Sequence, residues 1–564
     1  MQQLKDYPIL DLSGGLQQDK SPYLLKDSEL YVANNIQLDL GRVSKRLGSK
    51  QFGAFAVTPD TDEVLDAGIR SGSSFLLANK NTVADSGMIY KLATAFANGD
   101  IAAGATIITV DDVSTFAPAG QVEIDGDIIT YTGQGAGTLT GCTGVTSSHS
   151  GGTAIRQWLD AYAAPTATDL GTWFAYLNGL LVISRGLRGW DTFDGSTMTN
   201  QGGSGPFYIT TYKQRIYGVQ NNSSRVVFSE LADATANPTW PTDNTKYFDV
   251  EDETGSVIVN LRSYNGRLVI FKTNNTFYYD LSTLSMVNGQ VGTFNDKTVQ
   301  EINGLLYTIC PGGAFATNLS SFSEIGEPVK DFLANADYTK YPPRTGRLED
   351  LWVIYLGTVT IEQDTYTDVV LVYNTSLKAW SVWNGFTDFQ NFISLDSFVD
   401  SYNAFSLVPY VRNTPTLFWG TTTQKLFRMF NDRTSSKGYP SGATITTLGG
   451  DILQDKFYDT GSVIPSRVVT KFYHQNAPGW WKQFRYVRVL AEMWPFELEC
   501  RTQIGNGYSA WKSLGQASGP NCVLPINAEG YAIQFRIGES SKNQPWILNG
   551  LILEKTMAVS QNHN

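Results

Sequence analysis

Charged residues are scarce in this chain of 564 residues. They make up 17% of the sequence, and acids outnumber bases so that the formal net charge is −11. Soluble domains usually carry roughly 25% charged residues. A protein that grips nucleic acid needs a basic face to neutralise phosphates, so this composition argues against that class. It is compatible with a surface past which a polyanion slides without adhering.

Cysteine and histidine are rarer still. The three histidines and four cysteines are scattered, and no C-x-x-C pair occurs. A disulfide framework, a zinc site or a histidine-based triad needs these residue types in closer supply. The motifs G-x-S-x-G and H-E-x-x-H are absent, and no G-x-G-x-x-G opens a helix. We therefore predict no enzymatic activity, no cofactor and no metal site.

Long apolar runs and long helical patterns are missing too. No apolar run approaches the ~20 residues that span a membrane, and the first residues lack the basic-then-apolar pattern of an export signal. We therefore expect neither a membrane-spanning segment nor a Sec-type signal. Two short helices are predicted: one over 27–35, capped by Asp27 or Ser28, and one over 329–337. Most of the remainder alternates with period two or breaks at turn residues, which favours strands.

Aromatic residues and glycine are abundant, at 12% and 53 residues respectively, as is typical of short strands and tight turns. A hairpin pattern recurs every ~35–55 residues, the repeat length of propeller blades, with about seven copies between 64 and 432. Asn-Gly is the strongest two-residue hairpin signal because both positions tolerate positive φ. Three copies share it: Asn178-Gly179, Asn265-Gly266 and Asn303-Gly304. We predict an all-β fold, a β-propeller of about 6–8 blades; the alternative is an irregular pair of β-sandwiches.

Composition changes along the chain predict four parts. Residues 100–157 are rich in Gly, Thr and acids, and lack a blade pattern until Trp158. After a Ser/Thr/Gly-rich corner near 433, five alternating strands are typical of a β-sandwich. Closing a propeller usually takes strands from both ends of the array, and the early sequence can supply one. We expect "IQLDLGRVSKRLG" (36–48) to form a hairpin that turns at Gly41 and whose second strand enters the propeller. The expected parts are an N-terminal strap with the first propeller strand (1–60), the propeller (61–99 and 158–432), an inserted small β module (100–157) and a C-terminal β-sandwich (433–564).

Two groups of residues invite a binding interpretation. The stretch "DVEDET" gathers four acids, and we expect it to form an acidic lumen or blade corner, with a calcium loop as the alternative. The acids are Asp249, Glu251, Asp252 and Glu253. Two tryptophan pairs either stack on sugars or belong to a core or interface, and the second is the expectation. The pairs are Trp380 with Trp383 and Trp480 with Trp481.

The segment "SGGLQQDKSPYLLKDSELYVANNIQLDLGRVSKRLG" (13–48) resembles the N-terminal segment of tail nozzle proteins, also called tail tubular protein B, of short-tailed bacteriophages. The stretches 264–280 and 292–333 resemble that family's signature blade. Residues 531–554 are similar to the C-terminus of related needle-hub proteins, and 100–157 is similar to a module of many phage structural proteins. The candidate residues for an assembly interface are Gly14, Gly15, Asn35, Gly41, Arg42, Lys45 and Arg46.

The resemblance implies a structural virion protein. It implies a homohexameric ring below the portal and its adaptor ring, which forms the distal tail nozzle, conducts the genome during ejection and anchors tail fibres or spikes. Double-stranded DNA would pass through it only transiently, and the expected location is the virion tail, assembled in the host cytoplasm. The alternative is a receptor-binding or glycan-degrading tail fibre or spike protein, whose paired carboxylates would be invisible in sequence.

Overall fold

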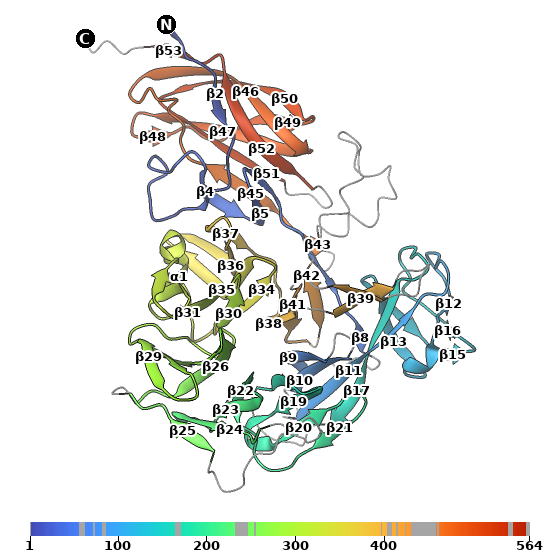
Figure 1. Ribbon diagram of the computed structural model, residues 1–564. Coiled ribbons are helices and arrows are strands. Elements are labelled where there is room, and N and C mark those ends of the chain that lie inside the picture. The colour runs from blue at the N-terminus through green and yellow to red at the C-terminus, as the bar shows by residue number, and fades with distance from the viewer. Residues whose placement is uncertain are drawn as a thin grey trace.

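The computed structural model is almost entirely β-structure (Figure 1). It describes residues 2–55, 62–70, 74–81, 86–163, 171–231, 246–252, 255–395, 398–402, 409–412, 416–423, 425–429, 458–459, 462–539 and 545–559. Over these residues the one α-helix is α1 (Lys330–Asn335), which confirms the helix predicted over 329–337; the 3-10 turns are η1 (Val113–Thr115), η2 (Gly186–Arg188) and η3 (Glu327–Val329).

Seven blades of four strands each form a ring, which confirms the predicted propeller. Four blades are separate sheets, and the first, sixth and seventh belong to larger sheets. The first blade consists of β9 (Asp62–Arg70), β10 (Ser74–Asn81), β11 (Ser86–Phe96) and β17 (Ala154–Ala163), and the second of β18 (Trp173–Leu177), β19 (Leu180–Ser184), β20 (Trp190–Phe193) and β21 (Met198–Asn200). The third blade consists of β22 (Phe207–Tyr212), β23 (Arg215–Val219), β24 (Arg225–Phe228) and β25 (Tyr247–Asp249). The fourth consists of β26 (Ile258–Tyr264), β27 (Arg267–Lys272), β28 (Thr276–Tyr279) and β29 (Leu284–Asn288).

The remaining blades complete the circle. The fifth blade consists of β30 (Val299–Ile302), β31 (Leu305–Cys310), β32 (Gly313–Thr317) and β33 (Phe322–Glu324). The sixth consists of β34 (Arg344–Leu348), β35 (Leu351–Ile361), β36 (Asp364–Asn374) and β37 (Ala379–Trp383). The seventh consists of β38 (Phe389–Leu395), β41 (Thr416–Thr421), β42 (Leu426–Met429) and β7 (Ser49–Gln51). Strand β38 lies against β9, so the last blade meets the first. The outer strand β7 comes from the N-terminal segment and pairs with β42, as expected for a ring closed by both ends of the chain.

The Asn-Gly hairpin prediction is confirmed at all three sites. In each turn the asparagine and the glycine both have positive φ, which is the geometry of a type I′ turn. The angles are 49° and 79° at Asn178-Gly179, 46° and 72° at Asn265-Gly266, and 50° and 74° at Asn303-Gly304. Each turn joins the first two strands of its blade, so the sequence signal marks where a blade begins.

The inserted module grows out of the first blade. Strands β11 and β17 run beyond that blade, and β13 (Gly120–Ile124) pairs with the extended part of β17. The module adds β12 (Ile107–Thr109), β14 (Asp127–Tyr131), β15 (Gly133–Gly135) and β16 (Thr138–Thr140) around its own buried apolar cluster. It projects from the side of the ring (Figure 1).

The carboxylate of Asp127 holds the loop around residues 146–149 of this module by hydrogen bonds. Asp127 accepts hydrogen bonds from Thr146, Ser147 and His149. Burial alone would raise its pKa, but the hydrogen bonds, the one with His149 first among them, outweigh this and hold the pKa well below its ordinary value of 3.8. The ionised carboxylate therefore stabilises the folded module.

Replacing Asp127 with asparagine is expected to destabilise the module by about 1–3 kcal/mol near neutral pH, because a network acceptor and a charge are lost. Because folding depresses the pKa of Asp127, its stabilisation is fully present at pH values above the ordinary pKa of 3.8. It disappears as the pH falls toward and through the pKa of the folded state. Thermal unfolding of both proteins from pH 7 to pH 2 should show their stability difference shrinking with acid. A difference that does not change with pH would contradict the electrostatic account.

A β-sandwich follows the propeller, as predicted, but the N-terminal segment builds part of it. Its strands are β45 (Ser466–Thr470), β46 (Trp481–Met493), β47 (Phe496–Ile504), β48 (Gly507–Tyr508), β49 (Lys512–Ala517), β50 (Asn521–Gly530), β51 (Ile533–Glu539), β52 (Ile547–Glu554) and β53 (Met557–Val559). The N-terminal segment adds β1 (Gln2–Gln3), β2 (Tyr7–Ile9), β3 (Gly15–Leu16), β4 (Glu29–Asn34), β5 (Ile36–Asp39) and β6 (Arg42–Lys45). Short strands β8 (Ala54–Phe55), β39 (Phe398–Tyr402), β40 (Pro409–Arg412), β43 (Tyr458–Asp459) and β44 (Ser462–Val463) complete the described elements.

Two predictions about the N-terminal segment are wrong. The helix predicted over 27–35 is strand β4, because pairing on both of its edges overrides the local cap signal. Asp27, the predicted cap, instead accepts from Tyr7 and pairs with Lys471. The hairpin turning at Gly41 does form, but its second strand β6 pairs with β52 of the sandwich rather than entering the propeller.

Candidate functional site

The candidate site is the joint between propeller and sandwich, formed by β3, β4, the hairpin β5–β6, and the neighbouring strands β37 and β45. Strand β4 pairs with blade strand β37 through Asn34 and Val382, and on its other edge with sandwich strand β45. The sixth blade and one face of the sandwich therefore share a continuous sheet of 11 strands.

Two glycines allow the N-terminal segment to pack closely, Gly15 against the sixth blade and Gly14 against Ser28 of the same segment. Gly15 has a φ of 74°, and a Cβ there would lie 2.8 Å from the backbone nitrogen of Trp380. At Gly14 a Cβ would lie 2.8 Å from the carbonyl oxygen of Ser28, to which the Gly14 amide donates over 2.9 Å. Side chains are excluded at both positions because the atoms they would meet are largely backbone.

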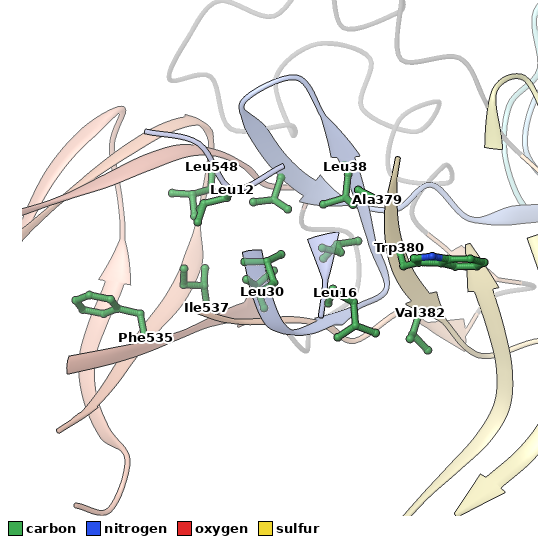
Figure 2. Packing of buried hydrophobic residues seen from close by; sticks show 14 of the residues in the cluster. Leu12, Leu16, Leu30, Leu38, Ala379, Trp380, Val382, Phe535, Ile537 and Leu548 are labelled. Carbon is green, nitrogen blue, oxygen red and sulfur yellow. The ribbon is translucent and has the colours of Figure 1, made fainter. Parts of the chain in front are cut away.

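Apolar side chains from three parts of the chain share one core at the joint (Figure 2). Leu12, Leu16, Leu30 and Leu38 of the N-terminal segment are at most 3% exposed. They lie between the blade residues Ala379, Trp380 and Val382 on one side and the sandwich residues Phe535, Ile537 and Leu548 on the other. Burying each leucine contributes about 1.5–3 kcal/mol, so the segment binds both domains.

A buried polar network of Asn35, Arg46 and Asn384 lies beside this core. Asn35, with a φ of 51°, accepts through Oδ1 from Arg46 Nε at 3.0 Å and from the Asn384 amide at 2.9 Å. Arg46 is fully buried and donates to the carbonyl oxygens of Leu47 (3.0 Å) and Asn384 (2.7 Å). Its guanidinium also lies 5.6 Å from the ring of Trp383. A planar donor fork suits this set of acceptors better than an ammonium would.

The other predicted interface residues lie on the same hairpin. Lys45 is buried and pairs with Glu539 of the sandwich at 2.9 Å; burial lowers its pKa although the carboxylate opposes this. Arg42 is half-buried and pairs with Glu492 at 2.9 Å. Gly41, with a φ of 74°, forms the turn between β5 and β6. All seven residues predicted for an interface thus lie on the N-terminal segment that forms the joint. Gly15, Asn35 and Arg46 contact the sixth blade or the residue that follows it, whereas Arg42 and Lys45 pair with the sandwich.

The acidic candidates separate into different environments. Asp249 pairs with Arg225 at 2.7 Å on the outer strands of the third blade. The Asp252 side chain is 2% exposed; it pairs with Lys272 at 3.1 Å and accepts from Asn275. Glu251 is exposed, and Glu253 lies outside the described residues. Asp252 is therefore part of a buried ion pair between neighbouring blades rather than of an open acidic corner or lumen.

The two tryptophan pairs differ in their exposure to solvent. Trp380 and Trp383 are 1% and 2% exposed, and their indole nitrogens donate to the carbonyl oxygens of Ile325 and Ile36. They are core residues and offer no face to a sugar. Trp480 is 37% exposed.

Across the described residues no group of three or more His, Cys, Asp or Glu side chains is placed to hold a metal ion. The same part of the chain contains no helix with the length and apolar character needed to cross a membrane.

Comparison with known proteins gives no family. No family model and no curated protein matches the chain. Among solved structures it is similar to the computationally designed Ika8 protein (8% identity, TM-score 0.32, 66% of this chain and 98% of that one). It is also similar to BamB from Moraxella catarrhalis (10% identity, TM-score 0.29, 59% and 99%) and the N-terminal domain of Nup159 (12% identity, TM-score 0.28, 45% and 74%). Likenesses of this strength carry no functional argument.

The partners of the predicted residues were missed by sequence reasoning. Asn384 bonds to Asn35 across 349 positions, and Glu539 pairs with Lys45 across 494. Neither residue stands in a motif. Only the N-terminal half of each contact was marked in the sequence. The marks were the pair Gly14-Gly15 and the basic residues Arg42, Lys45 and Arg46, which are unusual in so acidic a chain.

Proposed function

We propose that this chain is a structural virion protein, a subunit of a homohexameric tail nozzle or hub of a short-tailed bacteriophage. The observation that carries the proposal is that the segment resembling the nozzle family, residues 13–48, forms the joint of propeller and sandwich. Separate domains move relative to each other unless their interface is large and apolar. A continuous sheet over one shared core suits a ring subunit that must keep its shape during genome ejection.

The charge supports the same role. Six copies of a chain with a net charge of −11 would surround the passing duplex with a repulsive field. DNA then slides through without forming the salt-dependent contacts that basic proteins make. The module that projects from the side of the ring (Figure 1) is the part we assign to tail fibres or spikes.

Native mass spectrometry of the purified chain, alone and with its adaptor ring, tests the proposal. We expect a hexamer, either of the purified chain alone or once the adaptor ring is present. Monomers that never associate, even with the adaptor present, would contradict it. A deletion of the module that leaves the hexamer intact but abolishes fibre binding would support its separate role.

A further inference from the structure

A cavity of about 240 Å³ lies where the inner strands of the propeller converge. Side chains from β18, β22, β26, β30, β34 and β38 line it, together with the turn that precedes β30. Small-molecule sites in proteins are usually concave, mostly apolar, and equipped with a few convergent polar groups. This cavity is concave and has convergent polar groups, but polar atoms make up most of its wall, and the rings of Trp173 and Tyr208 supply a flat apolar part. It belongs neither to the joint nor to the proposed assembly.

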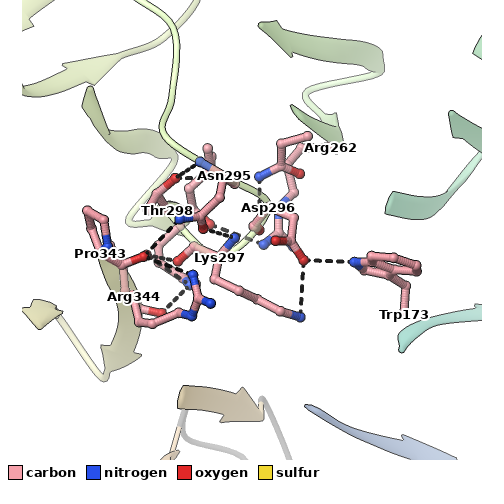
Figure 3. A network of polar contacts seen from close by, with 12 residues as sticks. Trp173, Arg262, Asn295, Asp296, Lys297, Thr298, Pro343 and Arg344 are labelled. Carbon is pink, nitrogen blue, oxygen red and sulfur yellow. Dashed lines mark hydrogen bonds and ion pairs between the residues drawn. The ribbon is translucent and has the colours of Figure 1, made fainter. Parts of the chain in front are cut away.

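The charge on the lining is positive. Asp296 accepts from the Trp173 indole nitrogen at 2.7 Å and pairs with Lys297 Nζ at 3.5 Å (Figure 3). Arg262, from β26, is a second cation on the lining, against this single carboxylate. Arg344 lies near Asp296; burial lowers its pKa, and the carboxylate only partly offsets this. A small anion entering the cavity would therefore meet an excess of positive charge.

Tyr208 is held in an unusual conformation at the cavity wall. Its φ is 53°, within an irregularity of β22 where the register shifts between Phe207 and Thr210. A bulky residue in the left-handed region costs about 1–3 kcal/mol, and such strain is concentrated at functional sites. Bulges re-aim side chains, and here the ring packs edge-on against Trp173 at 5.3 Å.

The Tyr208 hydroxyl is a ready donor. Burial first, and then the charge of Asp296, raise its pKa to about 12, so it keeps its proton. On the far wall, Ser394 accepts from the Arg347 amide at 2.7 Å, which leaves its own proton to donate. Two cations and two hydroxyl donors around flat aromatic rings match a carboxylate attached to a planar apolar body.

We propose that the propeller cavity binds a small planar organic anion, with the carboxylate against Lys297, Arg262 and the Tyr208 hydroxyl, and the apolar body against the rings of Trp173 and Tyr208. This inference is independent of the proposed tail function. A ligand in this position bridges inner strands of several blades, and would therefore stabilise the whole ring.

Calorimetric titration of the full-length chain with benzoate, and with benzyl alcohol as the neutral probe of similar shape, tests the proposal. We expect benzoate to bind at least ~10-fold more tightly than benzyl alcohol, and added salt to weaken it. Lys297→Gln and Tyr208→Phe should each weaken benzoate binding by about 5- to 10-fold, the usual effect of losing one polar contact to a charged ligand.

Arg267→Gln is the matched control, because Arg267 lies on β27 over the ring of Tyr278 and not on the cavity lining. It should bind benzoate as the unaltered chain does, and melting curves of all three variants show whether they are folded. Absence of benzoate binding, equal binding of the two probes, or undiminished binding by the folded Lys297→Gln and Tyr208→Phe variants would overturn the proposal.

Discussion

Replacing Gly15 with alanine is expected to destabilise the protein by about 2–5 kcal/mol, the sum of a left-handed conformation (about 1–2 kcal/mol) and steric overlap in a packed site (about 1–3 kcal/mol). The overlap arises because the new methyl would lie 2.8 Å from the Trp380 backbone and from the Ala379 side chain. The measurement is the shift in the thermal midpoint, followed by circular dichroism and by tryptophan fluorescence.

Gly41 provides a closely matched control. It has the same φ of 74°, but the nearest atom to an added Cβ is the Leu10 carbonyl oxygen at 3.9 Å. Gly41→Ala should therefore show only the conformational cost of about 1–2 kcal/mol. If the two variants lose the same stability, the close approach of the N-terminal segment to the sixth blade is not as described.

Replacing Arg46 with methionine is expected to cost about 3 kcal/mol, because two buried carbonyl oxygens and part of the Asn35 amide lose their donor. The loss should appear as a lower midpoint in urea-induced unfolding, with the signals of both domains affected. Arg46→Lys should recover little of it, since an ammonium cannot reproduce the fork that reaches Asn35, Leu47 and Asn384 together.

Arg42→Met is the comparison for this prediction. Arg42 lies on the same hairpin and its side chain is 39% exposed, with ion pairs to Glu492 and Asp39. Pairs of this kind contribute less than about 1 kcal/mol. If Arg42→Met lost as much stability as Arg46→Met, the buried polar network around Arg46 would contribute no more than a surface ion pair.

Local signals were enough to predict the blades. Asn178, Asn265 and Asn303 each precede a glycine, and each occupies the turn that this pair favours, independently of the rest of the fold. Period-two alternation and blade-length spacing then predicted the ring, and the change in composition at 100–157 predicted the insert. These features depend on contacts close in sequence.

The joint could be predicted only in part. The cap signal at Asp27 favoured a helix, and strand β4 forms because edges from β37 and β45 are available, both more than 300 positions away. The cavity gave no signal in sequence. Tyr208 reaches it through a bulge, and Asp296 and Lys297 sit in an ordinary-looking polar turn.

Hydrogen exchange of the intact chain and of the Gly15→Ala variant tests the central claim, that the N-terminal segment holds propeller and sandwich together as one body. We predict that the alanine lowers protection of the amides in β36–β37 and in β45–β51 together, while those of β18–β21 keep theirs. Loss of protection confined to residues 2–34, with β37 and β45 unchanged, would contradict it.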